Sequence, residues 1–111
     1  MMKVQQRDIV HLNFELPGGK MKMHPALVIS NENVLNTEEI FYAVMISTKT
    51  FNDEFTFELS NEMLSKPLLK KSFVKCQLIQ SYQQIEVLSK ISTLKPSFFK
   101  LVKDKIFNTV F

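Results

Sequence analysis

Two short polar clusters, each at the end of an apolar run, contain the residues best suited to chemistry. The first precedes the run 26–29 and consists of Lys20, Lys22 and His24. The second follows the run 40–46 and consists of Ser47, Thr48 and Lys49. Lysines attract a phosphate group, hydroxyls hydrogen-bond to it, and an imidazole with a pKa of roughly 6.5 can move a proton at neutral pH. If the two runs pair as antiparallel strands, both clusters meet at one end of a sheet.

Strand periodicity predicts the elements that would position these clusters. Alternating or continuous apolar residues predict five strands, over 7–14, 26–29, 40–46, 55–59 and 72–79. Pro25 is expected at the start of its strand, because proline cannot donate to a ladder.

The C-terminal segment has helical periodicity instead. After Pro96, apolar residues recur every four positions, at Phe98, Val102, Ile106 and Val110, with Leu101 beside them. This spacing predicts an amphipathic helix lying on the sheet, with proline tolerated in its first turn. Residues 31–39 fit a loop or a single helical turn, and 82–91 fit a loop or a short element. The predicted fold class is therefore mainly β with an attached C-terminal helix.

The size and composition are those of one domain, 1–111. Hydrophobic residues make up 45% of the sequence and ten residues are Phe, enough for a single packed core. Cys76 is the only cysteine and no leader-like segment opens the chain, so we expect a cytoplasmic protein without internal disulfides. No apolar run approaches the roughly 20 residues that span a bilayer, so no membrane partner is expected.

Metal and cofactor chemistry is not indicated by the sequence. His11, His24 and Cys76 are isolated from one another, without the spacing of metal ligands. No glycine-rich phosphate loop and no nucleophile-elbow motif is present. A Cys–His nucleophile pair is conceivable, but the apolar strand around Cys76 favours a buried, inert thiol. We therefore predict no metal and no cofactor.

The net charge of +3 hides an asymmetry between the two halves of the chain. Residues 1–65 hold five basic and nine acidic residues, a net charge of −4. Residues 66–111 hold nine lysines and two acidic residues, a net charge of +7. A basic second half suggests attraction to a polyanion or an acidic protein partner, although a solvated lysine surface would have the same composition.

In order along the chain, several segments resemble those of the MazF/PemK-like toxins of bacterial toxin–antitoxin pairs. These are Asp-Ile-Val at 8–10, Pro-Gly-Gly-Lys at 17–20, His-Pro-Ala-Leu-Val-Ile-Ser at 24–30, Ala-Val-Met-Ile-Ser-Thr at 43–48, Ser-Phe-Val-Lys-Cys-Gln-Leu-Ile at 72–79 and Ile-Ser-Thr-Leu at 91–94. The resemblance covers almost the whole chain, and the order and spacing of the segments make it specific.

The resemblance implies a small, strongly curved SH3-like β-barrel with helices attached, assembled as a homodimer. It also implies a metal-independent endoribonuclease that cuts single-stranded RNA by attack of the ribose 2′-OH on the adjacent phosphate, restrained by a cognate antitoxin. On this view His24, Ser47 and Thr48 are catalytic, and Lys20, Lys22 and Lys49 bind RNA.

One position departs from the family pattern. The family has arginine before the proline, where this chain has His24, and Arg7 is its only arginine. An imidazole can serve as general acid or base but cannot replace a permanently charged, forked guanidinium. Loss of such a contact can cost on the order of 100-fold in rate. Lys20 or Lys22 could supply the charge instead.

Several interpretations stay open. His24 is either a functional residue or a partly buried strand histidine bonded to the backbone, and Phe51 and Phe55 either stack on a base or belong to the core. The chain is a ribonuclease, or it is a non-catalytic module that binds nucleic acid or an acidic antitoxin. A toxin acting on gyrase through the same scaffold rests on fold analogy alone.

Overall fold

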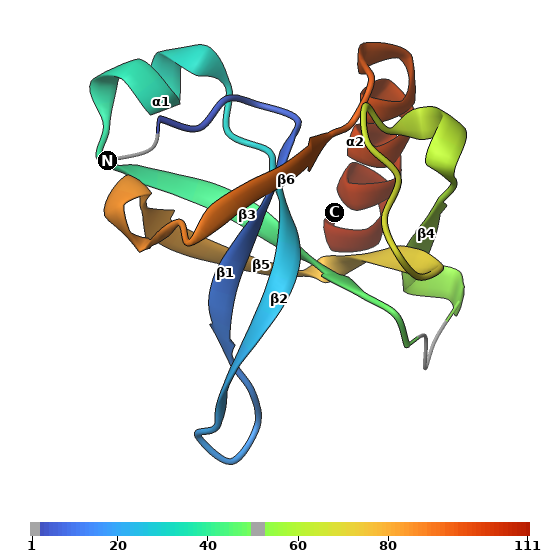
Figure 1. The fold of residues 1–111 in the computed structure, drawn as a ribbon, viewed down its shortest axis with the longest axis horizontal. Coiled ribbons are helices and arrows are strands. Elements are labelled where there is room, and N and C mark those ends of the chain that lie inside the picture. The colour runs from blue at the N-terminus through green and yellow to red at the C-terminus, as the bar shows by residue number, and fades with distance from the viewer. Residues whose placement is uncertain (1–2, 50–52) are drawn as a thin grey trace.

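The computed structural model describes residues 3–49 and 53–111 (Figure 1). Within these residues the elements are β1 (Asp8–Glu15), β2 (Met21–Val28), α1 (Glu32–Thr37), β3 (Ile40–Ser47), β4 (Thr56–Leu59), β5 (Ser72–Gln83), β6 (Ser89–Thr93) and α2 (Pro96–Val110). Short 3-10 turns cover 53–55, 61–63 and 84–86.

All of the strands belong to one antiparallel sheet of six, in the order β4-β5-β3-β2-β1-β6. The predicted fold class, mainly β with a C-terminal helix, is confirmed. The sheet is not closed into a barrel, since no ladder among the described residues joins its edge strands β4 and β6. Irregular segments link this side instead: Ser65 N–H donates to Thr93 O at 2.9 Å, and Lys95 N–H donates to Met63 O at 2.8 Å.

Two hydrophobic cores lie on opposite faces of the sheet, because side chains alternate along each strand. One core packs beneath α2, and its buried residues include Ile9, Leu27, Val44, Ile46, Val74, Cys76, Phe99 and Val102. The other packs towards α1, and includes Val10, Leu12, Phe14, Ala26, Phe41, Met45, Leu35 and Tyr82. Alternate residues along β1, β2 and β3 therefore lie on opposite faces of the sheet, one towards α2 and the other towards α1.

Two expectations about residue positions need correction, and one ambiguous segment can be assigned. Pro25 lies inside β2, opposite His11, rather than at its start. The strand tolerates it because pairing between β2 and β3 begins only at Ala26, so no ladder to β3 needs its missing N–H. The ambiguous segment 82–91 contains the end of β5, a 3-10 turn and the start of a sixth strand, β6.

The second correction concerns the apolar face of α2. Phe99, Val102 and Ile106 are its buried residues, whereas Leu101 and Val110 are exposed. Phe98 is only partly buried against the same core. A run of two phenylalanines fits either register of a helical stripe, and only the sheet decides which one is covered.

Candidate functional site

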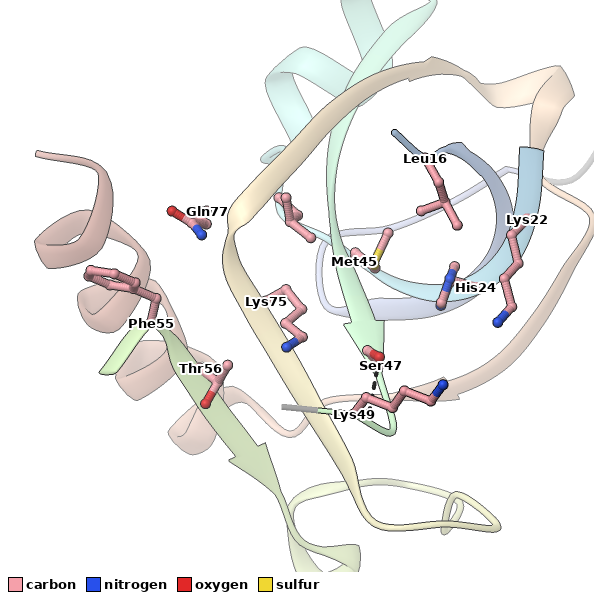
Figure 2. Close-up of a pocket in the computed structure, with 11 residues that line it drawn as sticks. Leu16, Lys22, His24, Met45, Ser47, Lys49, Phe55, Thr56, Lys75 and Gln77 are labelled. Atoms are coloured by element: carbon pink, nitrogen blue, oxygen red, sulfur yellow. Dashed lines mark hydrogen bonds between the residues drawn. The ribbon is translucent and has the colours of Figure 1, made fainter. Parts of the chain in front are cut away.

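A groove lies where the pairing between β3 and β5 is mismatched. Across two residues of β3, from Val44 to Ile46, β5 advances five, from Ile79 to Val74. Residues 75–78 of β5 stand opposite the single residue Met45 and bulge out of the ladder, as a bulge re-aims side chains near functional sites. The resulting cavity of about 360 Å³ is lined by Leu16, Lys22, His24, Met45, Ser47, Lys49, Phe55, Thr56, Lys75, Gln77 and Leu78 (Figure 2).

His24 and Ser47 lie on the same wall of this groove. Ala26 pairs with Met45, and continuing that antiparallel register by two residues sets His24 of β2 across from Ser47 of β3. Lys22 and His24 of the first polar cluster therefore meet Ser47 and Lys49 of the second, so the predicted meeting of the clusters is confirmed for these four residues. The Ser47 hydroxyl accepts a hydrogen bond from the Lys49 N–H at 3.1 Å, which fixes the turn out of β3.

The ring of His24 is held at the border between groove and core. It meets the buried ring of Phe14 edge-on, with ring centroids 6.0 Å apart and planes at 85°. Burial lowers the pKa of His24 below its ordinary value, and the nearby Lys22 ammonium lowers this pKa further. A hydrogen bond with the backbone of Ile46 acts in the opposite direction. The neutral imidazole, which can accept a proton, therefore predominates at neutral pH.

Lysines approach the groove from three strand ends. Lys22 is exposed on β2, Lys49 is exposed just after β3, and Lys75 is half-buried on β5. Figure 2 shows Lys75 on the opposite side of Ser47 from His24 and Lys22. A bound anion would therefore have positive charge on both sides.

The structure separates Thr48 and Lys20 from the other predicted site residues. Thr48 follows Ser47 and lines a different cavity of about 330 Å³, together with His11 and Pro25 on the α2 side of the sheet. Lys20 lies in the turn between β1 and β2, where its carbonyl accepts from Leu16 N–H at 2.7 Å, and it does not line the groove.

Seven groove residues were not among the predicted catalytic or RNA-binding residues: Leu16, Met45, Phe55, Thr56, Lys75, Gln77 and Leu78. Thr56 and Lys75 face one another across the β4–β5 ladder. Polar residues at alternate positions of the apolar segment 72–79 were the one sequence signal for Lys75 and Gln77. Of the two phenylalanines considered for base stacking, Phe55 lines the groove and Phe51 lies outside the described residues.

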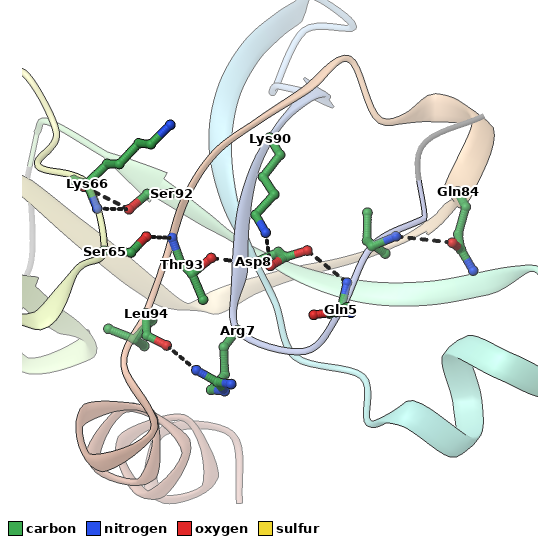
Figure 3. A network of polar contacts seen from close by, with 11 residues as sticks. Gln5, Arg7, Asp8, Ser65, Lys66, Gln84, Lys90, Ser92, Thr93 and Leu94 are labelled. Atoms are coloured by element: carbon green, nitrogen blue, oxygen red, sulfur yellow. Dashed lines mark hydrogen bonds and ion pairs between the residues drawn. The ribbon is translucent and has the colours of Figure 1, made fainter.

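The only arginine is committed elsewhere (Figure 3). The Arg7 guanidinium donates to Leu94 O at 2.8 Å, and its backbone N–H donates to Val28 O at 2.9 Å. Next to it, the buried carboxylate of Asp8 pairs with Lys90 at 3.1 Å. These contacts join the chain at Arg7 and Asp8 to β2, to β6 and to the residue after β6. Arg7 has a φ of 80°, a left-handed conformation uncommon outside glycine.

The described residues hold neither a reactive thiol nor a cluster of metal ligands. Cys76 is fully buried, and burial raises the pKa of its thiol, as expected of an inert core cysteine. Within 3–49 and 53–111, no three His, Cys, Asp or Glu side chains gather as metal ligands would. The helices in those ranges are too short and too polar to cross a membrane.

Comparison with known proteins gives a consistent picture. A family model described as "PemK-like, MazF-like toxin of type II toxin-antitoxin system" matches residues 5–109. No curated protein sequence matches the chain significantly.

Solved structures share the fold at low identity. MazF from Deinococcus radiodurans superposes with a TM-score of 0.78 at 14% identity, covering 99% of this chain and 98% of that one. The Mycobacterium tuberculosis toxin MazF-mt6 superposes with a TM-score of 0.74 at 19% identity, covering 92% of this chain and 94% of that one. A mycobacterial endoribonuclease in complex with its cognate antitoxin superposes with a TM-score of 0.76 at 14% identity, covering 96% of this chain and 94% of that one. These likenesses establish the fold, and the family match spans nearly the whole sequence. The chain therefore belongs to the PemK-like, MazF-like toxin family of type II toxin–antitoxin systems.

Proposed function

We propose that this protein is a metal-independent endoribonuclease that cuts single-stranded RNA through attack of a ribose 2′-OH on the adjacent phosphate. The observation that carries the proposal is the meeting of His24 and Ser47 in one groove bordered by lysines. Family membership and the endoribonucleases among its structural neighbours support the same reaction class.

The groove residues have complementary parts in this reaction. Neutral His24 accepts the proton of the 2′-OH while the 2′-oxygen bonds to phosphorus and the bond from phosphorus to the 5′-oxygen breaks. The departing 5′-oxygen takes a proton from water, leaving a 2′,3′-cyclic phosphate. The Ser47 hydroxyl orients a phosphate oxygen, and Lys22 and Lys49 attract the RNA backbone. Thr48, on the opposite face, would act only through the turn it shares with Ser47.

A direct test uses the chemistry of the nucleophile. The purified protein is first incubated with unstructured RNA in EDTA, and the cleavage sites are mapped. A short RNA spanning one site is then made in two versions, with and without the 2′-OH of the nucleotide on the 5′ side of the cut. We expect cleavage only with the 2′-OH present and a 2′,3′-cyclic phosphate on the product. Cleavage of the 2′-deoxy version would rule out the proposed attack.

A non-catalytic role is favoured by one observation, the commitment of Arg7 to the Leu94 carbonyl. No guanidinium of this chain reaches the groove, so transition-state charge must come from lysines. If those are insufficient, the groove would bind RNA or an acidic partner without cutting it. Salt-sensitive RNA binding without any product would distinguish this function from the nuclease.

Two protein partners belong to the proposal. A cognate antitoxin with acidic segments suits the charge of +7 on residues 66–111, and one structural neighbour is an endoribonuclease bound to its antitoxin. A homodimer is supported by exposed apolar side chains on and after α2, namely Leu101, Phe107, Val110 and Phe111. Light scattering of the purified protein would give its mass, and a monomer at all concentrations would contradict the dimer.

A further inference from the structure

We propose that Lys75 is the phosphate-binding cation of the groove, serving in place of the arginine that the family carries at the position of His24. This inference rests on the proposed function for the identity of its ligand, an RNA phosphate. Lys75 belongs to neither polar cluster of the sequence, and the bulge of β5 brings it to the groove.

The position of Lys75 is set by two strand pairings. Its backbone pairs with Thr56 of β4, and the ladder between β5 and β3 is interrupted directly after Val74. Lys75 is therefore the first residue of the bulge and is anchored on the β4 side. Thr56 and Gln77 line the same groove and can offer a hydroxyl and an amide to a bound phosphate.

Burial distinguishes Lys75 from the other groove lysines. Lys22 and Lys49 are exposed, where water and salt weaken their charge, whereas Lys75 is half-buried. A partly desolvated ammonium attracts an anion more strongly and loses less side-chain freedom on binding. Lys22 lies close enough to His24 to lower the pKa of that imidazole, so its charge also acts on the proposed base.

The arrangement replaces one side chain by two. A guanidinium before the proline would bring charge and hydrogen bonds from β2. Here β2 supplies an imidazole, and β5 supplies a lysine from the other side of Ser47 (Figure 2). Lys75 already interacts with the chain around it, so a phosphate would join or exchange with that contact.

Binding of an uncleavable ligand tests the contact without relying on catalysis. A single-stranded DNA of mixed sequence is titrated against wild type, Lys75→Met, Lys75→Arg and Lys103→Met between about 50 and 200 mM salt. Lys103 is an exposed lysine of α2 away from the groove, so its loss is the matched control for net charge. We expect Lys75→Met to reduce the slope of log K against log salt by about 0.7, one single-strand phosphate contact, and Lys103→Met to leave it unchanged.

Cleavage of RNA by the same variants separates this inference from the proposed function. We expect kcat to fall about 100-fold in Lys75→Met, with most activity kept in Lys75→Arg. If wild type cleaves RNA but Lys75→Met behaves like Lys103→Met in both assays, the inference fails and the nuclease stands. If wild type does not cleave RNA but Lys75→Met reduces the slope of log K against log salt, the nuclease fails and the phosphate contact stands. Thermal melts accompany each variant, and Lys75→Gln replaces Lys75→Met if methionine lowers the melting temperature.

Discussion

His24 of β2 and Ser47 of β3 line the same groove, each two residues beyond the paired Ala26 and Met45. Because side chains alternate along both strands, this register puts the imidazole and the hydroxyl on the same face of the sheet. A shift of one residue in either strand would move one of them to the α2 side. The catalytic proposal therefore depends on strand register as much as on residue type.

Register predicts opposite outcomes for two neighbouring hydroxyls. Ser47→Ala should lower the cleavage rate roughly 100-fold, as loss of one preorganised donor does, because Ser47 lines the groove. Thr48→Ala should stay near wild type, because Thr48 lines the cavity on the other face. Single-turnover rates on one RNA would measure both. Equal losses in the two variants would argue against the assignment of Ser47 to a phosphate contact.

The pH dependence should report the environment of His24. Its pKa is lowered first by burial and then by Lys22, so the neutral base persists to lower pH than in a free histidine. Activity should therefore be flat above about pH 6.5 and fall only at lower pH, as His24 becomes protonated. Lys22→Met removes the repulsion between the Lys22 ammonium and protonated His24, so the pKa of His24 should rise. The fall in activity at low pH, the acid limb of the profile, should then move to higher pH. Imidazole titration by NMR and the pH profile of kcat/KM would both show the shift; an unmoved limb would contradict the assignment.

Replacement of the only arginine should affect stability and leave catalysis intact. Arg7→Ala removes the charged hydrogen bond to Leu94 O and should lower the free energy of unfolding by about 1–2 kcal/mol. Arg7→Gly should lose less, because glycine relieves the strain of a φ of 80°, worth about 1 kcal/mol. Urea unfolding and cleavage rates below the melting temperature test both points. A large loss of kcat in folded Arg7→Ala would place the guanidinium in the reaction.

The single thiol should be unreactive in the folded protein. Cys76 is fully buried, burial raises its thiol pKa, and its Sγ donates to Val74 O at 3.7 Å. A colorimetric thiol reagent should label it only after unfolding in urea. Rapid labelling of the native protein, or loss of RNA cleavage on labelling without unfolding, would show that the thiol reaches the surface.

Local pattern was sufficient to predict much of this fold. Apolar continuity located β3, and the segment after Pro96 located α2, because burial imposes its period on the sequence. The start of β2 was harder to predict. Its residues from Met21 to Met23 extend beyond the buried core as an exposed hairpin arm, so no apolar period marks them as a strand.

The site was only partly predictable, because it depends on long-range pairing. Antiparallel strands bring His24 and Ser47 together once β2 and β3 are adjacent, so the sequence could suggest that meeting. The place of Lys75 depends on where the ladder between β5 and β3 slips, which no local pattern specifies. The net charge of each half of the chain was also a poor guide to which lysines line the groove. Of the nine lysines in residues 66–111, only Lys75 lines the groove, and the other two groove lysines come from the acidic half.

The most direct test of the central claim is the single-turnover cleavage of a long unstructured RNA in EDTA by wild type, His24→Ala and His24→Arg. Wild type should give discrete fragments ending in 2′,3′-cyclic phosphate, and His24→Ala should be slower by at least about 100-fold, the contribution of a general base. No cleavage by wild type, together with cleavage once arginine is restored in His24→Arg, would contradict the account. The groove would then be an intact nuclease scaffold whose role in this protein is to bind.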